Sequence, residues 1–194
     1  MKKFQLETIR KFMPTDPERP LLSTVQTDRN GLQVIVDGFS AYVFKTYVPE
    51  LEKYKRTIRE QSMQFEHIIP NNLPEYTKTD DDCKIWANLD KLRKWLKSTE
   101  QYGKFTNPVP IFGRFFNLSM LTVARDILGK NAKNLTVLCN DQKLAGIVIR
   151  NDDIEGFLLP IRMDMNFKNA KDFFSDNEKS CHEMIQKFLG TVVT

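Results

Sequence analysis

A helix followed by three short β-rich runs is predicted twice along this chain. In the first group the helix and the three runs lie at residues 4–13, 21–25, 32–36 and 41–44. Asn30 and Gly31 form the residue pair that favours the tight turn of a β hairpin, and Asp37-Gly38 marks a second turn. The first group is therefore expected to be a helix followed by a three-strand meander.

The second group repeats this order after one additional strand. Its strand, helix and three runs lie at residues 109–116, 118–128, 135–138, 144–149 and 157–161. Asn117 is expected to cap the start of the helix, and Gly129 to end it. The two groups together predict an α+β fold built from two halves of like architecture.

The connecting segments carry weaker signals. Residues 48–76 are interpreted as strand, although the charged part at 50–59 is compatible with a helix or with a solvated connection. Residues 71–82 have the composition of a loop. We expect a single domain over residues 1–163, with halves at about 1–75 and 105–163.

A helix predicted at 88–98, with Asn88 as its cap, bridges the two halves and has two different faces. The apolar face consists of Leu89, Leu92, Trp95 and Leu96, and the cationic face carries Lys91, Lys94 and Lys97. Such a charged stripe is most often the solvated side of a helix, and binding of nucleic-acid phosphates is the alternative. Trp86 and Trp95 are interpreted as packing residues.

The chain is expected to end in a helical extension at residues 164–194. Its apolar positions follow the helical spacing i, i+3, i+4, i+7 and are Cys181, Met184, Ile185 and Phe188. Gly190 is expected to end this helix.

Composition limits the class of protein without naming a partner. The 194 residues carry a net charge of +4, which permits binding to a polyanion without requiring it. Cys83, Cys139 and Cys181 are too widely spaced to indicate a disulfide framework or a zinc site. The first residues lack the apolar run of a signal peptide, so we expect a soluble, cytoplasmic protein with no membrane partner.

The sequence shows no pattern typical of catalysis. His67 and His182 have no partner at the spacing of a known nucleophile or zinc motif, and the isolated glycines form no phosphate-binding loop. Asp80, Asp81 and Asp82 are interpreted as a solvated loop rather than a metal site. We therefore expect no catalytic residue, metal or cofactor, while an enzyme with a composite site around these aspartates and His67 remains an open alternative.

Several short motifs resemble the bacterial DNA polymerase III β sliding clamp family. They occur in the family's order and are Arg19-Pro20-Leu21-Leu22, Val34-Ile35-Val36-Asp37-Gly38-Phe39, Phe65-Glu66-His67-Ile68-Ile69-Pro70, Phe116-Asn117-Leu118-Ser119-Met120-Leu121 and Leu158-Leu159-Pro160-Ile161-Arg162. The resemblance covers roughly residues 4–47 and 105–163, about one clamp domain. It implies a non-enzymatic DNA clamp fold in which the helices face DNA and the sheets lie outside.

The resemblance also implies partners and a contact surface. Duplex DNA would be bound through phosphates without reading of bases, by Arg10, Lys11, Lys91, Arg93, Lys94, Lys97, Arg125, Lys130 and Lys133. A processivity role in DNA replication, docking of replication proteins or clamp-binding peptides, and a homo-oligomeric ring of about six copies would follow. The tail from Asp164 has no counterpart in the family and is expected to block the edge used for ring closure or to fill the peptide groove. The alternative is a protein-interaction module of phage or mobile-element origin, an adaptor or decoy that keeps the clamp fold and does not encircle DNA.

Overall fold

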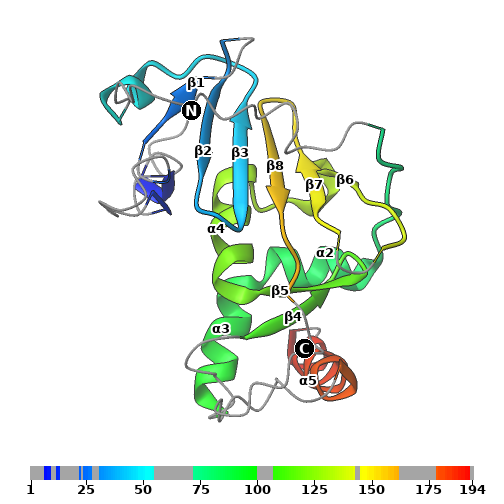
Figure 1. Cartoon of the computed structure of the whole chain (residues 1–194). Helices are drawn as coiled ribbons and strands as arrows, with labels where there is room; N and C mark the ends of the chain where they lie inside the picture. The colour runs from blue at the N-terminus through cyan, green and yellow to red at the C-terminus, as the bar shows by residue number, and fades with distance from the viewer. Residues whose placement is uncertain are drawn as a thin grey trace.

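The computed structural model describes residues 7–9, 12–13, 22, 24–27, 31–54, 72–99, 107–142, 145–161 and 178–192. Its architecture is mixed α+β, as predicted: a six-stranded antiparallel sheet is joined to a two-stranded hairpin and a set of helices (Figure 1). None of the described helices is long and apolar enough to cross a bilayer.

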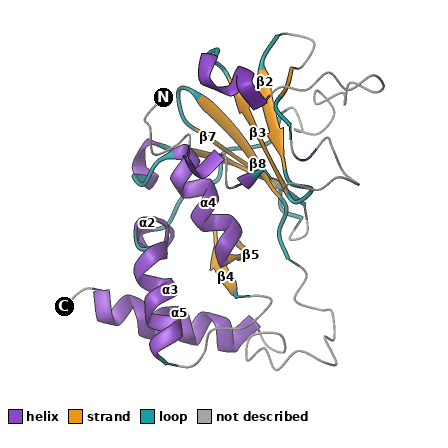
Figure 2. Ribbon diagram, turned by 90° about the vertical axis from the view of Figure 1, so that its left-hand side faces the viewer, coloured by secondary structure: helices purple, strands orange, loops and turns teal. Residues whose placement is uncertain are grey.

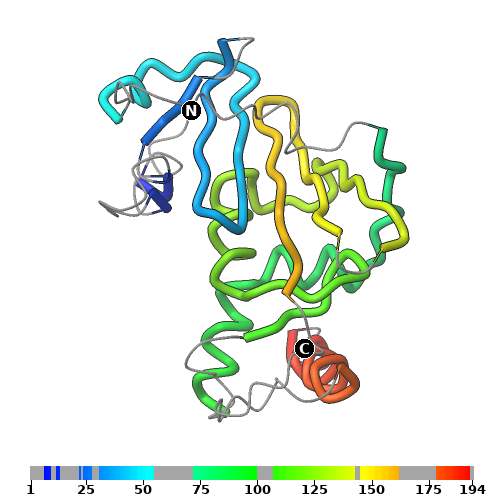
Figure 3. Tube along the Cα trace, in the orientation of Figure 1, coloured from blue at the N-terminus to red at the C-terminus, as the bar shows by residue number. Residues whose placement is uncertain are grey.

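The six-stranded sheet combines strands from both ends of the chain. Its strands are β1 (Gln26–Thr27), β2 (Gln33–Val36), β3 (Ser40–Phe44), β6 (Thr136–Leu138), β7 (Ile147–Arg150) and β8 (Ile154–Leu158). The spatial order is β1-β2-β3-β8-β7-β6, so the last strand of each predicted group meets the other at the centre. There Ser40 pairs with Leu158 and Phe44 with Ile154, and Figure 3 shows these strands side by side although they are far apart in sequence.

Of the two turns predicted for the first group, the one at Asp37-Gly38 is present. β1 and β2 pair antiparallel, and Gly31, which precedes β2, has a φ of 81°, while Asn30 lies outside the described residues. Gly38 has a φ of 93°, and the Asp37 carboxylate accepts hydrogen bonds from the backbone N–H groups of Phe39 and Ser40 at 2.9 and 2.7 Å. β1 is shorter than the strand predicted at 21–25 and lies just after it in the sequence.

The last strand also begins earlier than predicted. Instead of residues 157–161, β8 occupies Ile154–Leu158. The side-chain oxygen of Asn151 accepts hydrogen bonds from the backbone N–H groups of Asp153 and Ile154 at 2.9 and 2.7 Å. This tight turn returns the chain to the sheet at once, so pairing starts at Ile154.

Helix α4 (Leu118–Leu128) lies against one face of the six-stranded sheet (Figure 2). Its start is capped as predicted, because the Asn117 side chain accepts a hydrogen bond from the N–H of Ser119 at 2.8 Å. Gly129 ends the helix with a φ of 109°. Leu128 of this helix packs near Tyr42 and Gly156 of the central strands, within the main hydrophobic core.

The strand predicted at 109–116 is instead a hairpin. β4 (Pro108–Ile111) and β5 (Arg114–Asn117) pair across a two-residue turn at Phe112 and Gly113, which have φ values of 53° and 70°. A positive φ is unusual for phenylalanine. Phe112 is fully buried, and its backbone N–H donates a 2.7 Å hydrogen bond to Asp82, so contacts from elsewhere in the fold hold this conformation.

Three further helices pack below the sheet. They are α2 (Asp80–Ala87), α3 (Leu89–Ser98) and α5 (Glu178–Val192), and two short 3-10 helices lie at η2 (Pro49–Tyr54) and η4 (Ala132–Asn134). The prediction of a loop through Asp82 was wrong, because Thr79 and Asp82 form a capping box that starts α2. Asn88 does not cap α3 with its side chain, which instead donates to the carbonyl of Lys84 at 2.8 Å.

The C-terminal helix follows its predicted apolar spacing. Cys181, Met184, Ile185 and Phe188 are all buried. Gly190 was expected to end the helix, but α5 continues to Val192. A glycine inside the last turn costs helix stability without preventing it.

Some predictions can be followed only in part. Of the predicted helix at 4–13, residues 7–9 are helical and Ile9, Phe12 and Met13 are buried. Arg10, Lys11 and the 65–70 segment with His67 lie outside the described residues, as does most of the stretch interpreted as strand at 48–76.

Candidate functional site

The cationic face predicted on the bridging helix is exposed on α3. Lys91, Lys94 and Lys97 all have exposed side chains. The opposite face is buried through Leu89, Leu92 and Leu96, and Trp95 packs partly buried against the core. The apolar and cationic faces predicted from the sequence are therefore the buried and exposed faces of α3.

A second group of lysines lies beside the junction of α2 and α3. Lys130 and Lys133 are exposed and, together with Lys84, line an open depression of about 440 Å³. The described residues that line this depression include no carboxylate, although Lys84 forms an ion pair at 4.0 Å with Asp81, which lies outside it. The sequence did not identify Lys84, because it predicts a loop at 71–82 and no element at 83–87, where the structure has α2.

Two of the three arginines predicted to contact DNA, Arg93 and Arg125, have structural partners, and the third, Arg10, lies outside the described residues. Arg125 has a side chain only 2% exposed, and its guanidinium forms ion pairs with Asp90 at 2.7 Å and Asp126 at 2.8 Å. Arg93 is half-buried and donates to the Thr122 hydroxyl at 3.2 Å. Arg125 is therefore not available to a phosphate, because its charge is already neutralised between two helices.

Helix α4 does not present a basic surface. Of its residues, Ser119 is exposed, and Met120, Val123 and Asp126 are half-buried. Its other side is covered by α3, with Arg125 of α4 and Asp90 of α3 forming part of the contact. The basic surface of the described residues lies on α3 and near η4, rather than on the helix that covers the sheet.

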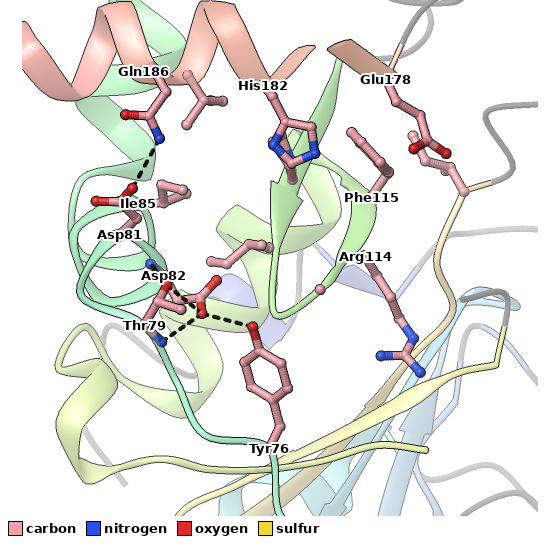
Figure 4. A pocket seen from close by; sticks show the side chains of 15 residues that line it. Tyr76, Thr79, Asp81, Asp82, Ile85, Arg114, Phe115, Glu178, His182 and Gln186 are labelled. Atoms are coloured by element: carbon pink, nitrogen blue, oxygen red, sulfur yellow. Dashed lines mark hydrogen bonds between the residues drawn. The ribbon is translucent and has the colours of Figure 1, made fainter. Parts of the chain in front are cut away.

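A cleft of about 610 Å³ lies between α2, the β4–β5 hairpin and α5. Figure 4 shows that its side chains come from four separate parts of the chain, with Asp81 and Asp82 from α2, Phe115 from β5, His182 and Gln186 from α5, and Tyr76 from the segment before α2. The side-chain amide of Gln186 donates to Asp81 at 3.0 Å and so links α5 to α2.

Asp82, at the edge of this cleft, is fully engaged in structural hydrogen bonds. Its two carboxylate oxygens accept from the N–H and hydroxyl of Thr79, both at 2.9 Å, from the Tyr76 hydroxyl at 3.2 Å and from the N–H of Phe112 at 2.7 Å. Burial, followed by the nearby Asp82 carboxylate, raises the pKa of Tyr76 to about 12. The phenol thus remains a hydrogen-bond donor at neutral pH.

Arg114 has an equally structural role. Its guanidinium donates to the backbone carbonyls of Asn140, Gln142 and Ala145 at 2.6, 2.8 and 3.0 Å. These bonds tie the loop between β6 and β7 to the hairpin. Arg114 is itself buried, and these carbonyls satisfy its guanidinium.

His182 lines this cleft on its α5 side, and Cys181 is the preceding residue of the same helix. His182 packs edge-on against the Phe115 ring, with centroids 5.4 Å apart, and makes no hydrogen bond to a carboxylate or nucleophile among the described residues. Burial raises the pKa of the Cys181 thiol to about 12, which keeps it protonated at neutral pH. In the described part of the chain, no three His, Cys, Asp or Glu side chains are placed to hold a metal ion.

The cleft residues could not have been grouped from sequence. Tyr76, Arg114 and Gln186 are separated by dozens of residues and share no motif. Comparison with known proteins finds no matching family model and no similar curated protein or solved structure. A functional assignment therefore depends on the two surfaces described above, the basic surface and the cleft.

Proposed function

We propose that this protein is a non-enzymatic, clamp-like accessory factor of DNA replication that binds duplex DNA through phosphate contacts. The observation that carries the proposal is the basic surface made by the exposed lysines of α3 and the lysines of the depression beside η4. These residues are Lys84, Lys91, Lys94, Lys97, Lys130 and Lys133. Mobile lysine side chains attract phosphates without reading bases, which suits a protein that must bind DNA of any sequence.

The two lysine groups are close enough to act together. Asn88 lines the depression and immediately precedes α3. Lys91 is three residues further along, which corresponds to about 4.5 Å of rise on a helix. We infer that both lysine groups contact phosphates of the same duplex.

The sheet supports the clamp-like part of the proposal. In the order β1-β2-β3-β8-β7-β6, the strands of the two sequence groups are arranged symmetrically about the β3–β8 pair, with α4 covering one face. Two halves of like architecture are what the resemblance to the clamp family implies. The basic surface on α3 differs from the family's arrangement, because α3 lies in the segment that bridges the two halves rather than in either half.

The outer edge of β6 favours a protein that does not close a ring. The N–H of Tyr76 donates to the carbonyl of Val137 at 2.8 Å, and the N–H of Cys139 donates to the carbonyl of Pro74 at 3.0 Å. The chain's own segment thus occupies an edge that a neighbouring copy would need for strand pairing. We propose that the protein contacts one side of the duplex rather than encircling it.

The test is fluorescence anisotropy with two labelled duplexes of unrelated sequence, titrated at several salt concentrations between 50 and 200 mM. We expect both duplexes to bind equally and the affinity to fall steeply with salt, with a log–log slope of about −4 if four to five phosphates are contacted. The double variant Lys91→Glu/Lys94→Glu should weaken binding to both duplexes about tenfold.

The matched control is Lys45→Glu/Lys53→Glu. Both lysines are exposed; Lys45 directly follows β3, and Lys53 lies in η2. This double substitution changes the net charge by the same amount as the α3 variant. If the control variant loses as much DNA affinity as the α3 variant, the loss reflects net charge alone, and the lysines of α3 are not the DNA-binding surface. Absence of binding at 50 mM salt would overturn DNA binding altogether.

A further inference from the structure

The cleft between α2, the β4–β5 hairpin and α5 has features of a binding site that the proposed DNA contacts do not use. We propose that it binds a segment of a partner protein in which an apolar side chain is followed by a basic one. This proposal does not depend on DNA binding.

The floor of the cleft is apolar and large enough to hold more than one side chain. Ile85 and Ile185 are almost fully buried at its base, while Phe115 and Ile161 are half-buried and present apolar surface. The volume of about 610 Å³ is within the range of protein pockets that hold ligands. An apolar side chain of a partner gains free energy by leaving water for this floor.

The charge of the residues that line the cleft favours the basic side chain of the bound segment. Its lining residues include three carboxylates, Asp81, Asp82 and Glu178, against the single guanidinium of Arg114. The Arg114 guanidinium is engaged by three backbone carbonyls. Asp81 accepts a hydrogen bond from Gln186 at 3.0 Å and forms an ion pair with Lys84 at 4.0 Å. Both side chains of this ion pair are nearly half exposed, and such a surface pair contributes little free energy, so a partner's cation can compete with Lys84 for the Asp81 carboxylate.

This net negative charge distinguishes the cleft from the lysine surface, and the two meet at the ion pair between Asp81 and Lys84. The negative charge repels nucleic-acid phosphates and attracts lysine or arginine side chains. Phe115 and His182, whose rings meet edge to face with centroids 5.4 Å apart, add aromatic surface on which a guanidinium or a lysine stem packs. In Figure 4 the side chains of Asp81 and His182 border the same opening from α2 and α5.

The walls of the cleft are held in place without a ligand. The bond between Gln186 and Asp81 fixes α5 against α2, and the bond between Asp82 and the N–H of Phe112 fixes the hairpin against α2. A preformed site loses little conformational entropy on binding, which favours recognition of a short segment.

The experiment uses the ¹⁵N-labelled full chain and two tripeptide probes, acetyl-Leu-Arg-Phe-amide and acetyl-Leu-Glu-Phe-amide, followed by NMR titration. We expect saturable shifts at the backbone N–H of Gly113 and the side-chain amide of Gln186, both of which line the cleft. The arginine probe should bind at least tenfold more tightly than the glutamate probe. Equal binding of the two probes, or shifts confined to other surfaces, would overturn the proposal.

Charge variants test the role of the rim. Asp81→Lys should weaken the arginine probe about tenfold, whereas Asp152→Lys, at an exposed position in the turn between β7 and β8, should change it less than twofold. Asp81→Asn keeps an oxygen for Gln186 and is the variant to use if Asp81→Lys does not fold, with an expected loss of about threefold. Unchanged binding in both Asp81 variants would contradict the proposal. The Lys91→Glu/Lys94→Glu variant should bind the probe as the unmodified chain does, so failure of DNA binding leaves this test unaffected.

Discussion

Replacing Asp82 by alanine removes the side chain that joins α2 to the β4–β5 hairpin. We expect Asp82→Ala to lower the free energy of unfolding by about 3 kcal/mol. The sequence places Asp82 in an acidic run typical of a solvated loop, where the same substitution would have little effect. The structure predicts a large effect because Asp82 is only 5% exposed and accepts hydrogen bonds from three other residues.

The magnitude has two main parts. Loss of the carboxylate from the capping box at Thr79 costs about 1 kcal/mol. The N–H of Phe112, now buried without an acceptor, costs about 2 kcal/mol more. The Tyr76 hydroxyl is in a half-buried residue and can turn to water, so its share is small. For a chain of this length the total corresponds to a decrease in Tm of roughly 6–12 °C.

Urea unfolding followed by the fluorescence of Trp86 and Trp95 measures this difference. The control is Asp80→Ala in the same helical turn, which is exposed and should cost about 0.5 kcal/mol. Asp82→Asn keeps an oxygen for the N–H of Phe112 and should lose about half as much as the alanine variant. Equal losses for Asp82→Ala and Asp80→Ala would refute the structural role assigned to Asp82.

Two further predictions concern Arg125 and Tyr76. Arg125→Met should lower the free energy of unfolding, measured by urea titration, by about 2 kcal/mol. This loss is smaller than for a fully buried ion pair, because Asp90 returns to water. The DNA affinity should stay within twofold of that of the unmodified chain, and a tenfold loss in a folded variant would instead make Arg125 a DNA contact. The pKa of Tyr76 is about 12 in the folded chain against 10.0 when exposed, so its contribution to stability is complete below pH 10 and lost as the pH rises through 12. Urea titrations from pH 9 to 12 should show a smaller decrease for Tyr76→Phe, and an equal decrease would contradict this assignment.

Elements with a strong local signal were predicted well. Asn117 and Gly129 delimit α4 because capping and positive φ depend on residues adjacent to the helix. The spacing of apolar residues from Cys181 to Phe188 likewise identified the buried face of α5. In each case the deciding interaction lies within a few residues of chain.

The hairpin of β4 and β5 was missed for the opposite reason. Residues 109–116 form an apolar run typical of a single strand, and nothing nearby requires phenylalanine at a turn. The positive φ of Phe112 is supported by a bond to Asp82, thirty residues earlier, and by burial against Trp86 and Tyr76. A long-range contact here overrides the local preference.

The sequence alone determined the α+β class and the exposed lysine stripe of α3, since both follow from the regular spacing of apolar and charged residues. Tertiary structure decided which other charges join that stripe. Packing of α3 against α4 places Asp90 beside Arg125 and neutralises it, while the approach of η4 to α2 brings Lys130 and Lys133 next to Lys84. The cleft likewise exists only where α2, the hairpin and α5 meet, because its charge and shape come from residues that no local pattern connects.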